Sequence, residues 1–406
     1  MIPLDEVRAR ILDTVSRLPV VEAPLAEALG LATAAPLTAA WDVPPFANTG
    51  MDGYAVRAAD TDGASHDTPV RLVVVDELAA GRAPTVAVEA GQAIRIMTGA
   101  PIPHGADGII MVEETAVDGD GVLVRREVRP GDHIRPAGGD LEAGAVAFPA
   151  GTVLTPAHLG VVASLGHATV PVVRRPRVAV MSTGDELTPP GEPLTPGRIT
   201  DTNRPMLRAL VAQAGCEAVD LGIARDDEAV IRERLEQAVA TCDALVTTGG
   251  VSMGEYDLVK KVLDSMGALN WWQVAIKPAK PLAFGLVGGR PVFGLPGNPV
   301  SSHVSFELFA RPALLQMMGH PHRFRPVVEA VAEHDMRRRP DGKLHLDRVR
   351  VRREDGRLLA GSTGVQASNV LSAMALANAL ALIPDGEGLA AGDAVQVMLL
   401  DHPADH

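Results

Sequence analysis

The chain has 406 residues, of which 47% are apolar and 21% are charged, and its formal net charge is −13. This composition is typical of a globular protein, and the length predicts about two to four domains with separate hydrophobic cores. A nucleic-acid-binding surface is not expected, because phosphate backbones are bound by clustered Lys and Arg and the chain has no long basic run.

The cysteines and the N-terminal segment both favour a cytoplasmic protein. Cys216 and Cys242 form neither a metal-ligand pair nor a secreted disulfide pattern. Residues 1–10 alternate acidic and basic side chains without the apolar core of a signal peptide, and no run of about 18 apolar residues occurs. We therefore expect no membrane-spanning segment.

Two short stretches near the beginning of the chain are predicted to be helical. Apolar residues at helical spacing occupy residues 7–15, and residues 24–30 begin with a proline and end with a glycine, as short helices do. Residues 156–165 have the same character, and we expect them to pair with the N-terminal helix. Residues 1–40 and 147–172 are thus predicted to form a small helical or linker domain.

Between residues 41 and 146 the pattern changes to short β-like runs separated by Gly, Pro and Asp, which predicts a β-rich domain. The expected strands lie at 71–75, 93–97, 108–112 and 122–124.

Residues 173–322 alternate strand and helix patterns, which predicts a doubly wound parallel sheet of the α/β class. The expected strands are 178–181, 219–223, 244–247 and 291–295, and the expected helices are 204–214, 228–241, 258–266 and 299–318.

Short strands return in residues 323–406, which we expect to form a small C-terminal β-barrel domain. The expected strands are 327–332, 344–351, 358–360 and 395–400, with one short helix at 370–377.

Turn-rich segments follow three of the predicted parallel strands, at residues 182–186, 247–252 and 295–299. Ligands of open α/β sheets bind at the carboxyl ends of the strands, so these segments are candidates for one shared site. Acidic residues follow the same strands and could hold Mg²⁺, which prefers oxygen ligands, or could instead cap helix N-termini. These acids are Asp185, Glu186, Asp226, Asp227, Glu255 and Asp257.

Two lysines are candidates for binding an oxyanion. Lys277 and Lys280 lie in a segment that two prolines stiffen, so both ammonium groups could be held in place. Residues 296–301 then open a long helix, whose first N–H groups favour an anion.

Residues 250–254 match the nucleophile-elbow pattern Gly-x-Ser-x-Gly, so a serine hydrolase that uses Ser252 is one alternative. The context disfavours it, since residues 247–249 separate the strand from the first glycine. A turn that approaches an anion with backbone N–H groups is the other interpretation. The chain contains neither a Walker A lysine motif nor a dinucleotide glycine fingerprint at a strand-to-helix position.

Taken together, several strings resemble the molybdopterin molybdenumtransferase family, the MoeA and gephyrin E-domain proteins. They occur in family order at residues 51–56, 95–101, 182–187, 201–203, 249–254, 277–281 and 295–301. The resemblance implies that molybdate is inserted into adenylylated molybdopterin with Mg²⁺ and that AMP is released. It also implies a homodimer in which the β-rich region of one subunit completes the α/β site of its partner; an upstream adenylyltransferase is a further candidate partner.

By motif position, the resemblance implies roles for particular residues. Catalysis would involve Asp52, Thr98, Glu186, Asp257, Lys277 and Lys280, and molybdate would be bound by Lys277, Lys280, Ser301, Arg348 and Ser368. The pterin and adenylate would be bound by Arg135, Asp140, Thr183, Gly184, Asp185, Asp226, Gly249, Gly250, Ser252, Pro296 and Pro299. Glu186, Asp226 and Asp257 would hold the metal, and Asp52, Thr98, Arg135 and Asp140 would come from the other subunit.

Three positions depart from the family pattern. Ala279 stands where a glycine is usual, Gln273 stands where some relatives carry a basic residue, and residues 135–140 lack the acid that often precedes Asp140. We expect these changes to affect how the substrate is bound rather than which reaction is catalysed. The competing interpretation of the same fold is a non-catalytic pterin-binding or scaffold protein.

Overall fold

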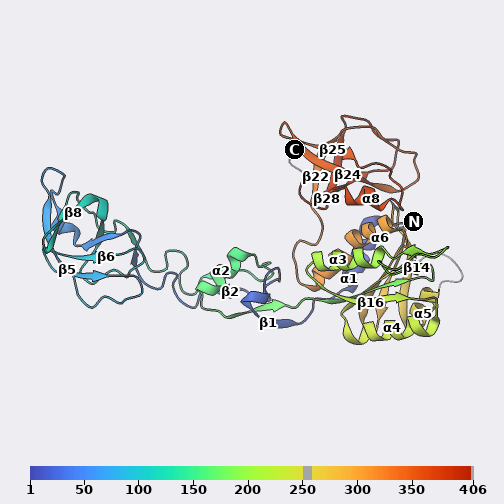
Figure 1. Cartoon of the computed structure of the whole chain (residues 1–406), viewed down its shortest axis with the longest axis horizontal. Helices are drawn as coiled ribbons and strands as arrows, with labels where there is room; N and C mark the ends of the chain where they lie inside the picture. Colours follow the sequence, from blue (N-terminus) through green and yellow to red (C-terminus); the bar gives the residue numbers. More distant parts are fainter. Residues whose placement is uncertain (250–257, 404–406) are drawn as a thin grey trace.

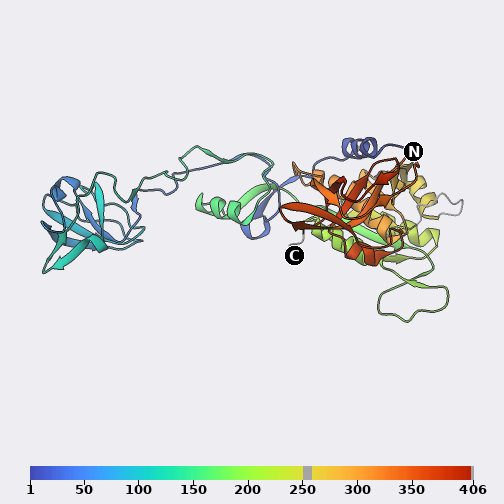
Figure 2. The same cartoon turned by 90° about the horizontal axis from the view of Figure 1, so that it is seen from above.

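The structure is a computed structural model that describes residues 1–249 and 258–403. It is elongated, with a β-rich domain at one end and the α/β and C-terminal domains at the other (Figure 1). Seen from above, extended connections run between the β-rich domain and the middle part (Figure 2). No helix in the described part of the chain is long and apolar enough to span a bilayer.

The N-terminal helix α1 (Leu4–Thr14) packs in the α/β domain. Its buried residues Val7 and Ile11 join the core there, and Gln316 donates hydrogen bonds to the carbonyl oxygens of Leu12 and Val15. The expected pairing of α1 with residues 156–165 is therefore wrong, because the apolar face of α1 is buried on α7 (Arg311–Met317) instead.

The middle part of the chain is built from two short ladders and one helix. Strand β1 (Val20–Pro24) pairs with β12 (Thr169–Val173), and β2 (Leu37–Thr38) pairs with β11 (Val146–Phe148). Helix α2 (Pro156–Ser164) begins at a capping box on Thr155, and the short turn η1 (Leu25–Glu27) follows β1.

The β-rich domain contains a six-stranded sheet in the order β7-β4-β6-β5-β9-β8. Its strands are β4 (Gly53–Val56), β5 (Val70–Leu78), β6 (Gln92–Ile96), β7 (Gly108–Met111), β8 (Thr115–Asp118) and β9 (Gly121–Val124). A separate ladder joins β3 (Asn48–Thr49) to β10 (Ile134–Arg135), and η2 (Ala58–Thr61) and η3 (Val112–Glu114) are single turns.

The α/β domain has a six-stranded sheet in the order β16-β13-β17-β21-β20-β18. The first four strands are parallel, as expected, whereas β20 and β18 add an antiparallel extension that the sequence patterns did not predict. The strands are β13 (Arg177–Thr183), β16 (Glu217–Ala224), β17 (Ala244–Thr248), β18 (Gly267–Gln273), β20 (Pro281–Val287) and β21 (Arg290–Leu295), with a small ladder between β14 (Leu187–Thr188) and β15 (Ile199–Thr200).

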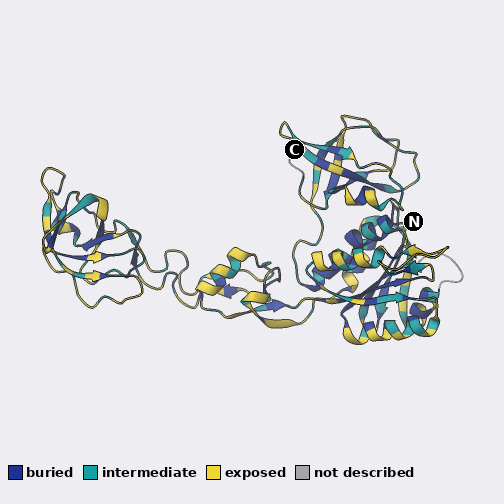
Figure 3. Cartoon of the chain, in the orientation of Figure 1, coloured by how far each residue is buried: buried dark blue, intermediate teal, exposed yellow. Residues whose placement is uncertain are grey.

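Helices cover both faces of this sheet. Side chains of β13 alternate between the two cores, since Val178 and Val180 join one cluster while Ala179 and Met181 join the other. One face carries α4 (Glu228–Thr241) and α5 (Leu258–Met266); the other carries α1, α3 (Asn203–Gln213), α6 (Pro299–Ser305), the π-helical turn η4 (Phe306–Ala310) and α7. Figure 3 shows buried strands beneath helices with exposed outer faces.

The C-terminal domain is a closed five-stranded barrel, because the strand order β24-β25-β22-β28-β26 returns from β26 to β24. Its strands are β22 (Val327–Ala332), β24 (Leu344–Glu354), β25 (Arg357–Ser362), β26 (Ala379–Ile383) and β28 (Ala394–Leu399), with α8 (Leu371–Ala375) and a ladder between β23 (Met336–Arg337) and β27 (Gly388–Leu389).

A buried carboxylate fastens the α/β domain where the chain enters it from the middle part. Asp243, immediately before β17, accepts hydrogen bonds from both terminal nitrogens of Arg174 at 2.6 Å and from the backbone N of Arg177 at 2.9 Å. Burial raises the pKa of Asp243, but the hydrogen bonds from Arg174 and Arg177 and the charge of Arg174 outweigh it and leave the pKa below its usual value.

We expect Asp243→Ala to lower the free energy of unfolding by about 3 kcal/mol, because it removes one partner of a largely buried pair. Urea unfolding followed by tryptophan fluorescence measures this. A depressed carboxyl pKa stabilises the fold above the unfolded value and loses that contribution as the pH falls, so the difference should shrink below about pH 4. Asp118→Ala, on an exposed pair with Arg71, is the control and should cost under about 1 kcal/mol; an equal loss in both variants contradicts the prediction.

Candidate functional site

The described parts of the three turn-rich segments, residues 182–186, 247–249 and 295–299, lie together at the carboxyl edge of the parallel strands. β13 lies beside β17, and β17 lies beside β21, so the segments after Thr183, Thr248 and Leu295 are neighbours. Thr183 donates from Oγ1 to the carbonyl oxygen of Thr248 at 3.4 Å. Gly249 has φ +86°, and a Cβ there would lie 2.7 Å from the carbonyl oxygen of Thr183, so only glycine fits this approach.

The predicted acidic residues separate into two kinds. Asp227 caps α4, where its carboxylate accepts hydrogen bonds from the backbone N of Ala229 and of Val230, so the capping interpretation is confirmed for this residue. Asp185 and Asp226 instead lie side by side, since each carboxylate accepts a 3.3 Å hydrogen bond from the other residue's backbone N.

Glu186 lines a small cavity of about 90 Å³, which we call the edge cavity. It is lined by Ser182, Thr183, Glu186, Leu187, Ile199, Thr200, Asp201, Thr202, Asn203, Thr248, Gly249, Gly297 and Pro299. Gly250, Ser252, Glu255 and Asp257 lie outside the described residues. Within the described ranges, no group of three or more His, Cys, Asp or Glu side chains is arranged to hold a metal ion.

Both predicted lysines line a pocket of about 550 Å³, which we call the lysine pocket. Ser301, which is buried in the first turn of α6, and Ser368, whose carbonyl oxygen accepts from the backbone N of Val300, line it as well. Its remaining lining residues are Ile276, Pro278, Ala279, Pro281, Pro296, Asn298, Lys343, Gln366, Ala367 and Asn369. The pocket therefore presents ammonium and hydroxyl donors on several elements, which suits an oxyanion.

Ala279 has a backbone conformation that accounts for the glycine usual at this position. Its φ is +73°, in the left-handed region, and the residue is buried between the two lysines. A Cβ in this conformation is strained by about 1–2 kcal/mol relative to glycine. The departure at Ala279 therefore keeps the turn and changes only its strain. Gln273, at the end of β18, lines neither the edge cavity nor the lysine pocket.

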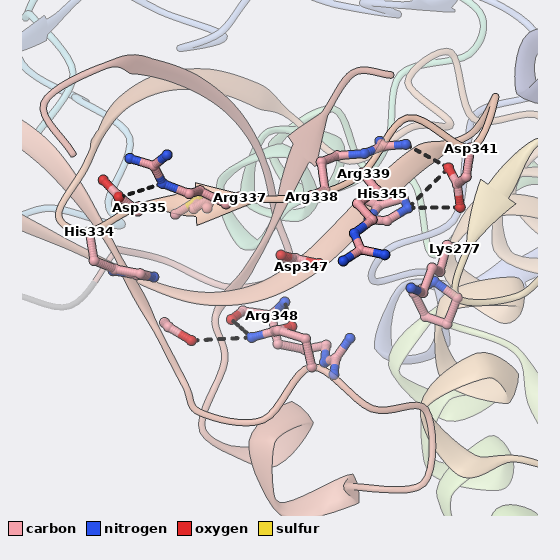
Figure 4. Close-up of a pocket in the computed structure, with 14 residues that line it drawn as sticks. Lys277, His334, Asp335, Arg337, Arg338, Arg339, Asp341, His345, Asp347 and Arg348 are labelled. Carbon is pink, nitrogen blue, oxygen red and sulfur yellow. Dashed lines mark hydrogen bonds and ion pairs between the residues drawn. The ribbon is translucent and has the colours of Figure 1, made fainter. Parts of the chain in front are cut away.

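A short strand of the α/β domain joins the barrel and brings Lys277 to it. β19 (Ile276–Lys277) pairs in parallel with β24, so that Lys277 lies opposite His345. Lys277 therefore also lines a second pocket of about 530 Å³, the arginine pocket, with Arg337, Arg338, Arg339, His345, Asp347 and Arg348 (Figure 4).

Arg348 is the most deeply buried charge of the arginine pocket. Its Nη2 donates to the carbonyl oxygens of Val365 and Ala367, whereas Nε and Nη1 are buried without a partner among the described residues. Burial lowers the pKa of Arg348 from its usual value. Arg348 lines the arginine pocket and not the lysine pocket, but Lys277 and Gln366 line both.

Asp341 and Asp347, two carboxylates that line the arginine pocket, have opposite pKa shifts. Burial raises the pKa of Asp347, although the surrounding cations lower it in part. Hydrogen bonds from Lys343 and His345 hold the pKa of Asp341 at about 2. Sequence analysis missed Lys343 and His345, and it also missed the basic run at residues 337–339, which is visible in the sequence.

The β-rich domain holds its own group of predicted residues. Asp52 accepts hydrogen bonds from the backbone N and from Oγ1 of Thr98, both at 2.7 Å, and these bonds lower the pKa of Asp52. Arg135 lies on β10 beside Gly50, and Asp140 is exposed shortly after it. This domain lies at one end of the elongated molecule, and the α/β and C-terminal domains, whose residues line the lysine pocket, lie at the other end (Figures 1 and 2).

Models of known protein families match the N-terminal, central and C-terminal parts of the chain. A model of the MoeA N-terminal region (domain I and II) matches residues 2–166, one of a probable molybdopterin binding domain matches residues 179–316, and one of the MoeA C-terminal region (domain IV) matches residues 330–400. Molybdopterin molybdenumtransferase 2 of Mycobacterium tuberculosis is 42% identical over 93% of this chain and 94% of its own. The molybdopterin molybdenumtransferase of Haemophilus influenzae is 36% identical over 99% of both chains.

A solved structure extends this similarity to the whole fold. The molybdopterin biosynthesis MoeA protein from Pyrococcus horikosii is 32% identical, covers 99% of this chain and 100% of its own, and has a TM-score of 0.83. The family and the fold class expected from the motifs are thereby confirmed. The chain belongs to the molybdopterin molybdenumtransferase family and is a transferase of molybdenum cofactor biosynthesis.

Proposed function

We propose that this enzyme inserts molybdate into adenylylated molybdopterin, with Mg²⁺, and releases AMP. The observation that carries the proposal is the position of the lysine pocket next to the edge cavity, with the turn at residues 296–299 between them. Pro296 and Asn298 line the lysine pocket, while Gly297 and Pro299 line the edge cavity. A heterocyclic substrate that reacts with an oxyanion would fit across this turn, with the oxyanion in the lysine pocket and the heterocycle in the edge cavity.

The lysine pocket would position molybdate. A tetrahedral dianion loses its water shell on binding, so several fixed donors must replace that water. Lys277 and Lys280 supply ammonium groups, and Ser301 and Ser368 supply hydroxyl groups. In a chain of net charge −13, this local excess of cations supports binding of an anion here rather than elsewhere on the surface.

The loop acids fit Mg²⁺ in their chemistry. The side chain of Glu186 has no hydrogen-bond or ion-pair partner among the described residues, and one carboxylate oxygen of Asp226 is bonded only to the backbone of Asp185. Carboxylate oxygens of this kind are the ligands that Mg²⁺ prefers, so Glu186 and Asp226 would hold it, together with Asp257 of the undescribed segment. When bound, the ion would offset negative charge on the phosphoanhydride as AMP leaves.

A homodimer would complete the site. Asp52, Thr98, Arg135 and Asp140 are implied in the same reaction, yet within one chain the β-rich domain lies at the other end of the molecule from the α/β and C-terminal domains (Figure 1). An isologous dimer can bring the β-rich domain of one subunit to the α/β domain of the other. We propose that this is how the Asp52–Thr98 pair reaches the substrate.

We expect Lys280→Ala to reduce AMP release from adenylylated molybdopterin by about thirty-fold or more, because it removes a charge-assisted contact of about 2 kcal/mol. Rates at increasing molybdate concentrations measure this. Lys261→Ala is the matched control, since Lys261 pairs with Glu228 on the surface and should leave the rate unchanged. Equal rates in wild type and Lys280→Ala would count against the proposal; a pterin-binding scaffold would bind the substrate but release no AMP in either.

A mixing experiment tests the shared site. We expect Asp52→Ala and Lys280→Ala proteins each to have little activity and an equal mixture to regain about a quarter of wild-type activity after subunit exchange, because half of the dimers then contain one intact site. Recovery is measured as AMP release against protein mixed without exchange. If both residues act in the same subunit, the mixture stays inactive and the proposed dimer site is wrong.

Metal removal tests the role of the acids. Chelation should lower AMP release to background, and added Mg²⁺ should restore it. Glu186→Gln should raise the Mg²⁺ concentration that is needed for half-maximal rate, because the variant loses a carboxylate ligand. Asp227→Asn is the control, since asparagine also caps helices and Asp227 is bonded to α4. Activity that resists chelation would rule out the metal.

A further inference from the structure

The sequence motif Asp201-Thr202-Asn203 contains two residues with different tasks at the start of α3. Asp201 is buried and accepts hydrogen bonds from Oγ of Ser182 and from the backbone N and Nε of Arg204. These partners belong to β13 and α3, so Asp201 joins the strand to the helix. Asn203 contacts the two turns of the candidate site instead.

The amide of Asn203 can be oriented in only one way. Its Nδ2 donates to Oγ1 of Thr248 at 2.8 Å and to the carbonyl oxygen of Gly297 at 2.7 Å. The carbonyl oxygen of Gly297 can only accept, so it fixes the nitrogen of the amide on its side. The nitrogen must therefore face these two turns, and Oδ1 must face away from them.

Oδ1 of Asn203 is buried and has no hydrogen-bond partner among the described residues. Asn203 lines the edge cavity together with Glu186. A buried acceptor without a donor is unfavourable in a folded protein, and such atoms call for an explanation such as a ligand. The residue that carries this unpaired acceptor therefore lines the same cavity as a carboxylate residue, and a bound ligand with an N–H group could supply the missing donor.

We infer that Asn203 is a substrate-binding residue whose Oδ1 accepts a hydrogen bond from an N–H group at the edge of a fused nitrogen heterocycle. Both the pterin and the adenine of the proposed substrate carry N–H donors of this kind. The inference rests on the proposed function for the identity of the substrate. It concerns binding of the heterocycle alone and does not depend on molybdate insertion or AMP release.

The test measures equilibrium binding of three separate probes, molybdopterin, AMP and molybdate, to the full chain. Asn203→Ala should weaken binding of one heterocyclic probe by about ten-fold, because it removes one hydrogen-bond acceptor. Molybdate binding should be unchanged, since the lysine pocket lies on the other side of the 296–299 turn. Loss of molybdopterin binding assigns Asn203 to the pterin, and loss of AMP binding assigns it to the adenine.

Two further variants separate a ligand contact from a role in holding the turns. Thr248→Val removes one acceptor of the Asn203 amide but keeps Oδ1, so heterocycle binding should change by less than about two-fold. Asn203→Asp keeps an oxygen at the Oδ1 position but cannot donate to the carbonyl oxygen of Gly297, so heterocycle binding that survives in this variant would place the contact on Oδ1 and not on the turns.

Unchanged binding of both heterocycles in Asn203→Ala overturns the inference. So does an equal loss in Thr248→Val, or a parallel loss of molybdate binding, since each would mean that Asn203 acts only through the turns. Failure of the proposed insertion reaction would appear differently, as heterocycle binding that still depends on Asn203 without any release of AMP.

Discussion

The candidate site depends on the pairing of one two-residue strand with the C-terminal barrel. β19 belongs to the α/β domain by sequence, yet it pairs in parallel with β24 and places Lys277 opposite His345. Because Lys280 follows in the same turn, this ladder fixes both lysines between α6 and the barrel loop that carries Ser368. Without it, the barrel would share few backbone contacts with the sheet edge, and the lysine pocket would lose one wall.

The turn at residues 296–299 separates two environments of opposite hydrogen-bonding character. On one side, the lysine pocket is lined by lysine and serine residues, and on the other, the edge cavity is lined by Glu186 and by Asn203 with its unpaired Oδ1. Asn203 holds this turn through the carbonyl oxygen of Gly297, so the wall is fixed from the acceptor side. A ligand that carries N–H donors at one end and meets an oxyanion at the other can therefore bind in one orientation only, because reversing it would place like groups together.

The sequence predicts α4 to the residue and the end of α5 at Met266, since a capping Asp227 and regular apolar spacing mark the first and a strong apolar face marks the second. It fails at β20 and β18, although Gly288 and Gly289, both with positive φ, are the residues expected in a two-residue hairpin turn. The convergence of the three turns followed from parallel topology alone. The burial of Arg348 and the orientation of Asn203 could not be predicted, because both depend on loops that come from other parts of the chain.

In the proposed dimer, one half of the site lies in the β-rich domain and the other half at the edge of the α/β sheet. Each half must therefore be held in place by contacts of its own domain. Asp52 lies at an exposed turn far from the lysine pocket, so it has to be held in place by its own domain. The two hydrogen bonds from Thr98 do this, and they also lower the pKa of Asp52. On the other half, Asn203 and the β19–β24 ladder hold the turns in the same way. Each half is therefore ordered by contacts within itself, so the dimer proposed above would form its shared site without rearrangement inside either half.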